Sequence, residues 1–150
     1  MRPAAETRFG RVFDIEEYDD ATTVHVGDLE LSFAETQHSE LCFAARVTDG
    51  RASLVYSGDA GLTGGLVEHC KDADLVLLEA TYTRDLPAHE APRHLSARDA
   101  GELAQRAGAD RLVLCHLGSD DADNVERLRI AAARFGGVTD IATENATFVL

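Results

Sequence analysis

The sequence predicts an α/β fold in which a mixed β-sheet is flanked by helices. Residues 11–59 largely alternate apolar and polar side chains with a period of two, which is typical of half-buried antiparallel strands. From residue 60 onward, short and nearly continuous apolar runs alternate with helix-like segments, which indicates strands covered by helices. A chain of 150 residues suits one domain, so we expect residues 1–150 to form a single domain.

The first half predicts a series of antiparallel strands. Residues 11–18 read as a first strand, and residues 22–36 read as two further strands joined at Gly27-Asp28. Residues 41–59 predict a second hairpin, and Asp49-Gly50 predicts a type I′ turn at its tip.

The second half predicts a β-α-β-α-β-α order. Ser96 and Asp99 have the spacing of a capping box, and Gly108 lies where a helix C-cap glycine is expected, so this segment is predicted to be a helix. The predicted elements are a short helix in 61–72, a strand in 73–80, a helix in 96–108, a strand in 110–116, a helix that starts at residue 122 and ends before Gly136-Gly137, and one or two short strands in 140–150.

Composition narrows the class of protein. The formal net charge is −13, from 14 basic and 27 acidic residues, and Lys71 is the only lysine. Nucleic-acid binding depends on phosphate neutralisation by basic residues, so a large polyanion is a poor candidate partner. No apolar run approaches a membrane span, the N-terminus lacks the apolar core of a signal peptide, and three cysteines without C-x-x-C spacing suggest reduced thiols. We therefore expect a cytoplasmic location without a membrane partner.

Several candidate metal ligands follow predicted strands. Asp59, Glu79 and His116 each end an apolar run, and sites in α/β sheets lie at the carboxyl ends of strands. His38 follows another strand, and His94 precedes the capped helix. Each residue alone has a simpler explanation, such as a helix N-cap for Asp59 or a polar strand end for His116. Together, however, imidazole and carboxylate groups form a ligand set suited to zinc, manganese or iron.

The order of these segments resembles the C-terminal half of the metallo-β-lactamase fold, and most closely its ribonuclease Z and phosphodiesterase-like branch. The matching segments, which run from residue 29 onward, are AETQHSELCFAARV, LVYSGDAG, DLVLLEATY, HLSARDAGELAQRAGADRLVLCHL and ARFGGVTDIATENATFVL. The resemblance implies half of an αββα sandwich with a mixed sheet.

The resemblance also implies a role for each candidate residue. His38 matches the histidine that binds a first metal ion, Asp59 the aspartate that bridges two ions, and His116 the histidine that binds the second ion. Glu79 and His94 match a catalytic carboxylate–histidine pair that assists proton transfer and holds a phosphate oxygen. The implied cofactor is two zinc ions, with manganese or iron possible, and a hydroxide held between them attacks the substrate.

One family signature, H-x-H-x-D-H, is absent from this sequence. We therefore expect a half-domain that lacks the N-terminal half and holds only part of the dinuclear site. Three interpretations stay open: a fragment of a longer hydrolase, a subunit that meets an N-terminal half on another chain, or a non-catalytic half-domain that serves in binding or oligomerisation. Because a half-domain leaves one apolar sheet face uncovered, we expect homo-oligomers or association with an N-terminal half.

The interval between His38 and Asp59 narrows the expected substrate. The ribonuclease Z branch carries a long arm for transfer RNA in this interval, whereas this sequence has a bare hairpin. With the acidic net charge, this favours a small phosphodiester, such as a cyclic nucleotide or a phosphorylated metabolite. Other small esters and lactones stay open, because this fold hosts many chemistries.

Overall fold

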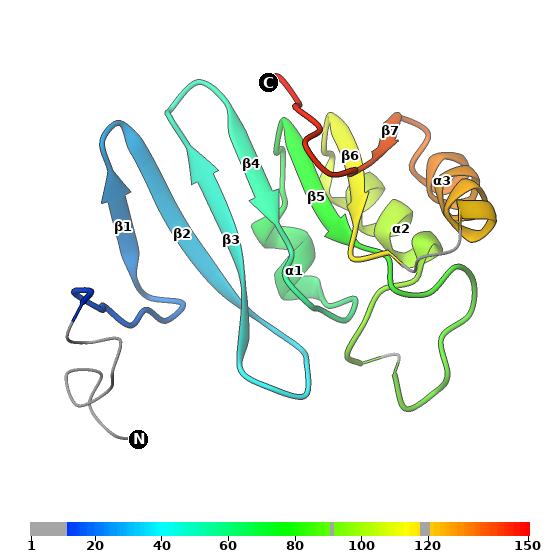
Figure 1. Cartoon of the computed structure of the whole chain (residues 1–150), viewed down its shortest axis with the longest axis horizontal. Helices are drawn as coiled ribbons and strands as arrows, with labels where there is room; N and C mark the ends of the chain where they lie inside the picture. The colour runs from blue at the N-terminus through cyan, green and yellow to red at the C-terminus, as the bar shows by residue number, and fades with distance from the viewer. Residues whose placement is uncertain (1–11, 91, 118–120) are drawn as a thin grey trace.

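A computed structural model describes residues 12–90, 92–117 and 121–150. Within these residues, seven strands form one mixed sheet in the order β1-β2-β3-β4-β5-β6-β7 (Figure 1). The pairs from β1 to β4 are antiparallel, and the pairs from β4 to β7 are parallel. The strands are β1 (Thr23–Val26), β2 (Leu29–Thr36), β3 (Cys42–Thr48), β4 (Ser53–Tyr56), β5 (Leu75–Glu79), β6 (Arg111–Cys115) and β7 (Val138–Ile141).

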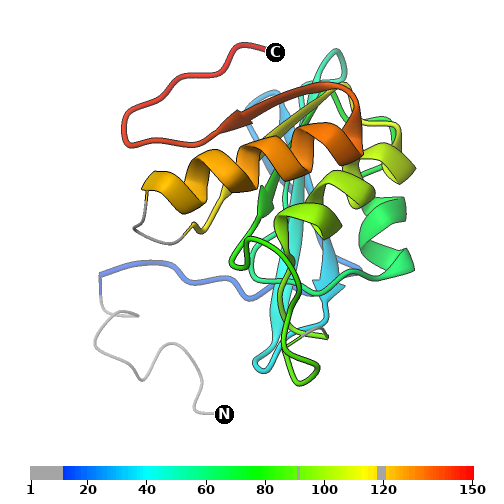
Figure 2. The same cartoon turned by 90° about the vertical axis from the view of Figure 1, so that its right-hand side faces the viewer.

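Three helices complete the described part of the fold, and they are α1 (Gly64–His69), α2 (Ala97–Ala107) and α3 (Asp121–Phe135). Figure 2 shows α1 and α2 against one face of the sheet, while α3 lies along α2 and near β7. The predicted α/β class with a mixed sheet is therefore confirmed. None of these helices is long and apolar enough to cross a membrane.

The main core lies between the sheet and the helices. Leu78 on β5, Leu114 on β6 and Leu103 on α2 are all fully buried there. Successive strand residues point to opposite faces of a sheet. On β6, Val113 lies between Leu112 and Leu114 and is also fully buried, so β6 is covered on both faces at this position. Strands covered on both faces explain why β5 and β6 read as nearly continuous apolar runs.

Helix α2 begins and ends as its sequence predicts. The Ser96 hydroxyl accepts a hydrogen bond from the amide of Asp99, and the Asp99 carboxylate accepts one from the amide of Ser96. Gly108 ends the helix with a φ of 69°, a left-handed conformation that glycine adopts without strain. The N-terminal cap, together with the bond from the amide of Ala97 to the carbonyl of Tyr82 at 2.8 Å, holds the segment that carries His94.

Three sequence predictions were wrong in detail. Residues 12–18 form no strand, and the ring of Tyr18 instead stacks on Phe33 at a centroid distance of 3.9 Å. The hairpin tip is a four-residue loop, 49–52, because the Asp49 carboxylate accepts bonds from the amides of Arg51 and Ala52. The last strand starts at Val138 rather than at residue 140, and residues 142–150 lie outside any strand. Residue 11 of the first predicted strand lies outside the described residues.

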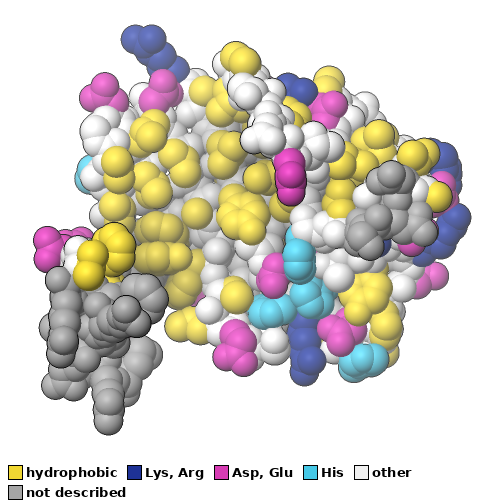
Figure 3. Space-filling view, in the orientation of Figure 1, with side chains coloured by type: hydrophobic (Ala, Val, Ile, Leu, Met, Phe, Trp, Pro, Cys, Tyr) yellow, Lys and Arg dark blue, Asp and Glu magenta, His cyan; other side chains and the backbone are white. Residues whose placement is uncertain are grey.

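The sheet face opposite α1 and α2 carries many apolar side chains, which gather over the middle strands in Figure 3. The Tyr56 side chain is 43% exposed, and that of Leu29 at the start of β2 is 41% exposed. The C-terminal segment crosses part of this face, where the Phe148 ring lies 5.1 Å from the guanidinium carbon of Arg111. We call this the open face of the sheet.

The last residue of α1 leads to a prediction about pH. His69 Nε2 is buried and has no hydrogen-bond partner among the described residues. Burial, and secondly the charge of Arg46, lowers the pKa of His69 below its ordinary value of 6.5. The unfolded chain therefore binds more protons than the folded chain at mildly acidic pH, so stability falls as the pH drops below about 6.5 toward the lower folded pKa.

We expect the His69→Leu variant to lose less stability than the wild type between pH 7.5 and pH 5.5, as measured by urea unfolding. The matched control is His25→Leu on the exposed strand β1, which should keep the wild-type pH dependence. Equal slopes for the wild type and His69→Leu would contradict the prediction.

Candidate metal centre

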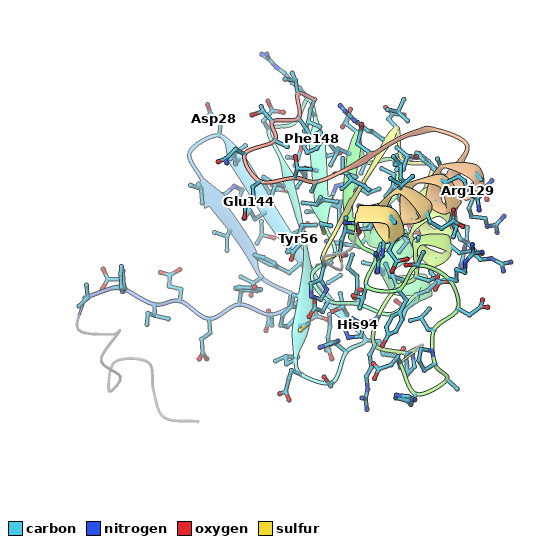
Figure 4. All side chains as sticks on the ribbon, turned by 45° about the vertical axis from the view of Figure 1, so that its right-hand side comes forward. Asp28, Tyr56, His94, Arg129, Glu144 and Phe148 are labelled. Carbon is cyan, nitrogen blue, oxygen red and sulfur yellow. The ribbon has the colours of Figure 1, made fainter. Side chains whose placement is uncertain are left out.

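The five candidate residues come from different elements and meet at the carboxyl edge of the sheet. His38 follows β2, Asp59 follows β4, Glu79 ends β5 and His116 follows β6. His94 lies in the segment that leads into α2 (Figure 4). The histidines form a group beside acidic side chains in Figure 3. Parallel strands bring their carboxyl ends to one edge, and that is why sequence positions far apart become neighbours.

Glu79 is the buried member of the group, with no exposed surface. Its Oε1 atom accepts hydrogen bonds from the amide of Ala60 at 2.8 Å and from His94 Nδ1 at 3.0 Å. Its Oε2 atom accepts a hydrogen bond from the Thr81 hydroxyl at 2.6 Å. A buried carboxylate is tolerated where donors surround it, so this set of bonds stabilises the negative charge and fixes the His94 ring.

Asp59 is the more accessible carboxylate and lies between two histidines. Its Oδ1 atom is 3.2 Å from His116 Nδ1, and its Oδ2 atom is 3.9 Å from His38 Nε2. Gly58 places Asp59, because its φ is 61° and an added Cβ would lie 3.1 Å from the Phe43 carbonyl oxygen. A carboxylate with one oxygen toward each of two histidines can bridge two cations.

The ring protons of the histidines can be assigned from their oxygen partners. His38 Nδ1 lies 2.9 Å from the carbonyl oxygen of Arg93, which can only accept a hydrogen bond. His94 Nδ1 faces the Glu79 carboxylate, and His116 Nδ1 faces Asp59 Oδ1 and the Thr81 hydroxyl. In each neutral ring the proton then belongs on Nδ1, and Nε2 keeps the lone pair that binds metal ions.

This donor set fits a divalent cation. Ligand atoms of Glu79, His94 and His116 lie within 4.8 Å of one another. Because hydrogen bonds already occupy both Glu79 oxygens, Asp59 is the carboxylate with more freedom to bind a cation.

The neighbouring thiols stay protonated. Burial raises the pKa of Cys115 to about 12, and the charges of Glu79 and Asp59 add to the effect. Burial, followed by Asp59 and Glu40, also raises the pKa of Cys42. Among the described residues, the group whose ligand atoms lie within 4.8 Å of one another, Glu79, His94 and His116, offers nitrogen and oxygen and no sulfur.

Thr81 is the polar residue of the centre that the sequence analysis missed. Its hydroxyl lies 2.6 Å from Glu79 Oε2, 3.1 Å from His116 Nδ1 and 3.4 Å from His94 Nδ1. A signal was present, because Thr81 is two residues after Glu79 and alternate residues of an extended chain lie on the same side. By contrast, no local pattern indicates that His116 has a φ of 49°, a left-handed conformation that is uncommon in residues other than glycine.

Comparison with known proteins adds the family context. The family described as the beta-lactamase superfamily domain matches residues 3–117. The metallo-β-lactamase-fold protein YhfI from Bacillus subtilis is 35% identical over 91 residues, which are 61% of this chain and 37% of YhfI. Its crystal structure superposes with a TM-score of 0.76 at 29% identity, covering 83% of this chain and 51% of that one.

Two further relatives extend this similarity. Ribonuclease Z from Myxococcus xanthus is 39% identical over 99 residues, which are 65% of this chain and 32% of that enzyme. An isothiocyanate hydrolase from Delia radicum gut bacteria has the same fold, with a TM-score of 0.71 at 14% identity, covering 92% of this chain and 60% of that one. The chain thus spans less than half the length of the curated relatives that it matches.

The hydrogen bonds of Glu79 lead to a prediction about stability. Glu79→Gln replaces one accepting oxygen by an amide nitrogen while Ala60, His94 and Thr81 still donate. We expect the free energy of unfolding to fall by about 1–3 kcal/mol, because a buried donor loses its partner. Urea unfolding at pH 7.5 measures the change.

The matched control is Glu35→Gln on β2, where the side chain is exposed and the change should be close to zero. An unchanged or higher stability of Glu79→Gln would mean that the cost of burying the charge exceeds the gain from its hydrogen bonds.

Proposed function

The chain belongs to the beta-lactamase superfamily, and on that premise we propose that it contributes part of the dinuclear centre of a metal-dependent hydrolase that cleaves small phosphodiesters. The observation that carries this proposal is the Asp59 carboxylate between His38 and His116, beside the buried Glu79–His94 pair. The family membership supports a metal-dependent hydrolase, and the geometry supplies a role for each residue.

His38 and His116 would each bind one cation, and Asp59 would lie between the two. Zinc is the first choice for this nitrogen and oxygen set, with manganese or iron as alternatives. When bound, two such cations lower the pKa of a water molecule and offset the negative charge that develops on the substrate. His38 is prepared for this role because its Nδ1 proton is held by the Arg93 carbonyl, so Nε2 is available.

Glu79 and His94 would transfer a proton to the leaving group. His94 Nδ1 is held by the Glu79 carboxylate at 3.0 Å, and its ring centroid lies 5.0 Å from that of His38. A carboxylate on Nδ1 stabilises the imidazolium form, so His94 can donate a proton from Nε2 to a departing oxygen. The same ring can hold a phosphate oxygen before the bond breaks.

The substrate class rests on two supports. The ribonuclease Z relative is by its name an enzyme that acts on RNA, in which nucleotides are linked by phosphodiesters. In this chain the interval from His38 to Asp59 contains β3, β4 and a four-residue loop, and the net charge is −13. A short hairpin offers no arm for a folded RNA, so a small phosphodiester suits this centre better than precursor transfer RNA. Other small esters and lactones are the alternative substrates.

Three histidine and aspartate ligands are too few for two complete cation sites, so further ligands must come from additional protein. The open face carries the exposed side chains of Tyr56, which ends β4 beside this edge, and of Leu29, at the opposite end of the sheet. This face is the surface that such protein would cover. The occupant would be an N-terminal half of the same fold or, in a homo-oligomer, a second copy of this chain. The competing function is a non-catalytic half-domain for binding or oligomerisation, which would use this face without metal.

Metal retention separates the two functions. After loading with zinc or manganese and removal of free ions, we expect the wild-type chain to retain metal by elemental analysis. The double variant Asp59→Ala, His116→Ala should lose it, because both proposed cations lose a ligand. The matched control, Asp28→Ala with His25→Ala on the exposed β1–β2 hairpin, carries the same change in charge and should retain it.

No retained metal in the wild type would contradict a cation site assembled by this chain alone, and would leave an incomplete half that needs additional ligands or the non-catalytic half-domain. Substrate class is tested on the loaded chain with bis-(p-nitrophenyl) phosphate and precursor transfer RNA. Hydrolysis of the small diester alone supports the proposal, and cleavage of the RNA alone contradicts it.

Association through the open face is a separate prediction. We expect sedimentation velocity to detect concentration-dependent association of the wild type and a weaker association of Tyr56→Glu, because a charge placed in an apolar interface must be desolvated. The control is Leu41→Glu, which changes a side chain that is 70% exposed in the loop between β2 and β3. A monomer at all concentrations, with cooperative unfolding, would contradict the prediction.

A further inference from the structure

A buried arginine of α3 lies behind the candidate metal centre. The Arg127 side chain is 5% exposed, and a guanidinium group keeps its charge at every accessible pH. Its Nε and Nη2 atoms donate to the carbonyl oxygens of Ala80 and Thr81 at 3.0 and 3.1 Å, and Nη1 donates to Asn124 Oδ1 at 3.0 Å. Burying a charge costs free energy, and these hydrogen bonds offset part of that cost. The position of a buried charge behind the centre therefore calls for an explanation.

The two carbonyls belong to the turn that leaves β5. The amide of Ala80 makes the last bond toward β6, to the carbonyl of Cys115 at 2.9 Å, and the amide of Tyr82 already bonds to Leu95. The carbonyls of Ala80 and Thr81 instead face α3, where the planar guanidinium group of Arg127 donates a hydrogen bond to each in a fixed geometry. Arg127 therefore sets the backbone conformation directly after Glu79.

Thr81 connects this turn to the centre. At 2.6 Å the Thr81 hydroxyl donates its single hydrogen bond to Glu79 Oε2, so its oxygen can accept a hydrogen bond from His116 Nδ1 at 3.1 Å. The His116 backbone has a φ of 49°, a conformation that persists where surrounding contacts hold it. The Thr81 hydroxyl is one of these contacts, and Asp59 is another.

We propose that Arg127 is a positioning residue of the metal centre that acts through Thr81. It fixes the Thr81 hydroxyl between Glu79 and His116, and this contact keeps the His116 proton on Nδ1 and leaves Nε2 free. The inference rests on the proposed function in one respect, namely that His116 binds a cation. An arginine that only anchored α3 to the sheet would change stability and leave the His116 ring unaffected.

A double-mutant cycle tests the proposal. Arg127→Lys keeps the charge but loses the fork, and Thr81→Val keeps the shape but loses the hydroxyl. Each single change should weaken zinc binding by about 10-fold in competition with a chromophoric chelator, as for other groups that orient metal ligands. The double variant should bind zinc no more weakly than the weaker single variant, because both changes remove the same contact.

The second measurement uses the metal-free chain. The ¹⁵N shifts of the imidazole nitrogens report the tautomer of His116, and both single variants should move them in the same direction. Arg111→Lys is the control, because Arg111 pairs with Asp140 between β6 and β7. It should lower stability without changing the zinc affinity or the His116 shifts. Arg127→Met leaves no uncompensated buried charge and replaces Arg127→Lys if that variant does not fold.

Additive losses in the cycle, or wild-type zinc affinity and wild-type His116 shifts in Arg127→Lys, would overturn the inference. Failure of the proposed function has a different signature: the wild type would bind no zinc, while the His116 shifts would still respond to Arg127→Lys and Thr81→Val. Thr81→Ser restores the hydroxyl and should restore the wild-type shifts.

Discussion

The fully buried carboxylate of Glu79 is the constraint on which the carboxyl edge of the sheet depends. A charge without solvent must find donors within the protein, and its donors come from the segments after β4, after β5 and before α2. Meeting this requirement draws Ala60, Thr81 and His94 around one side chain. The amide of Glu79 itself bonds to the Ser57 hydroxyl at 3.0 Å and so ties the end of β5 to the loop after β4.

The two carboxylates of the centre differ because their surroundings differ. Glu79 has every oxygen engaged by a donor and no exposed surface, which suits a group that orients and stabilises a neighbouring histidine. The Asp59 side chain is 37% exposed and meets His38 and His116 through one oxygen each, which suits a group that binds ions. One type of side chain thus has two roles, and burial together with hydrogen bonding separates them.

The overall charge also bears on the proposed function. With a net charge of −13 the protein repels anions, and a phosphodiester is an anion. Bound divalent cations are the largest local charges in such sites and would reverse the sign of the field at this edge. Metal binding would then be required for the approach of the substrate as well as for its hydrolysis. This requirement is a physical reason why three histidines lie beside two carboxylates at this edge.

The sequence by itself determined the order of the strands and helices from residue 22 onward, the caps of α2, and the meeting of His38, Asp59, Glu79, His94 and His116 at one edge. These features follow from local periodicity, local capping bonds and the rule that parallel strands end on the same side. Tertiary structure decided the rest. Tyr18 packs on Phe33 rather than joining a strand, and Arg127 meets the carbonyl of Ala80, 47 residues earlier in the chain. No pattern in the neighbouring sequence predicts such contacts. They form only when the folded chain brings an aromatic ring or a main-chain carbonyl without a partner next to a residue from a distant segment.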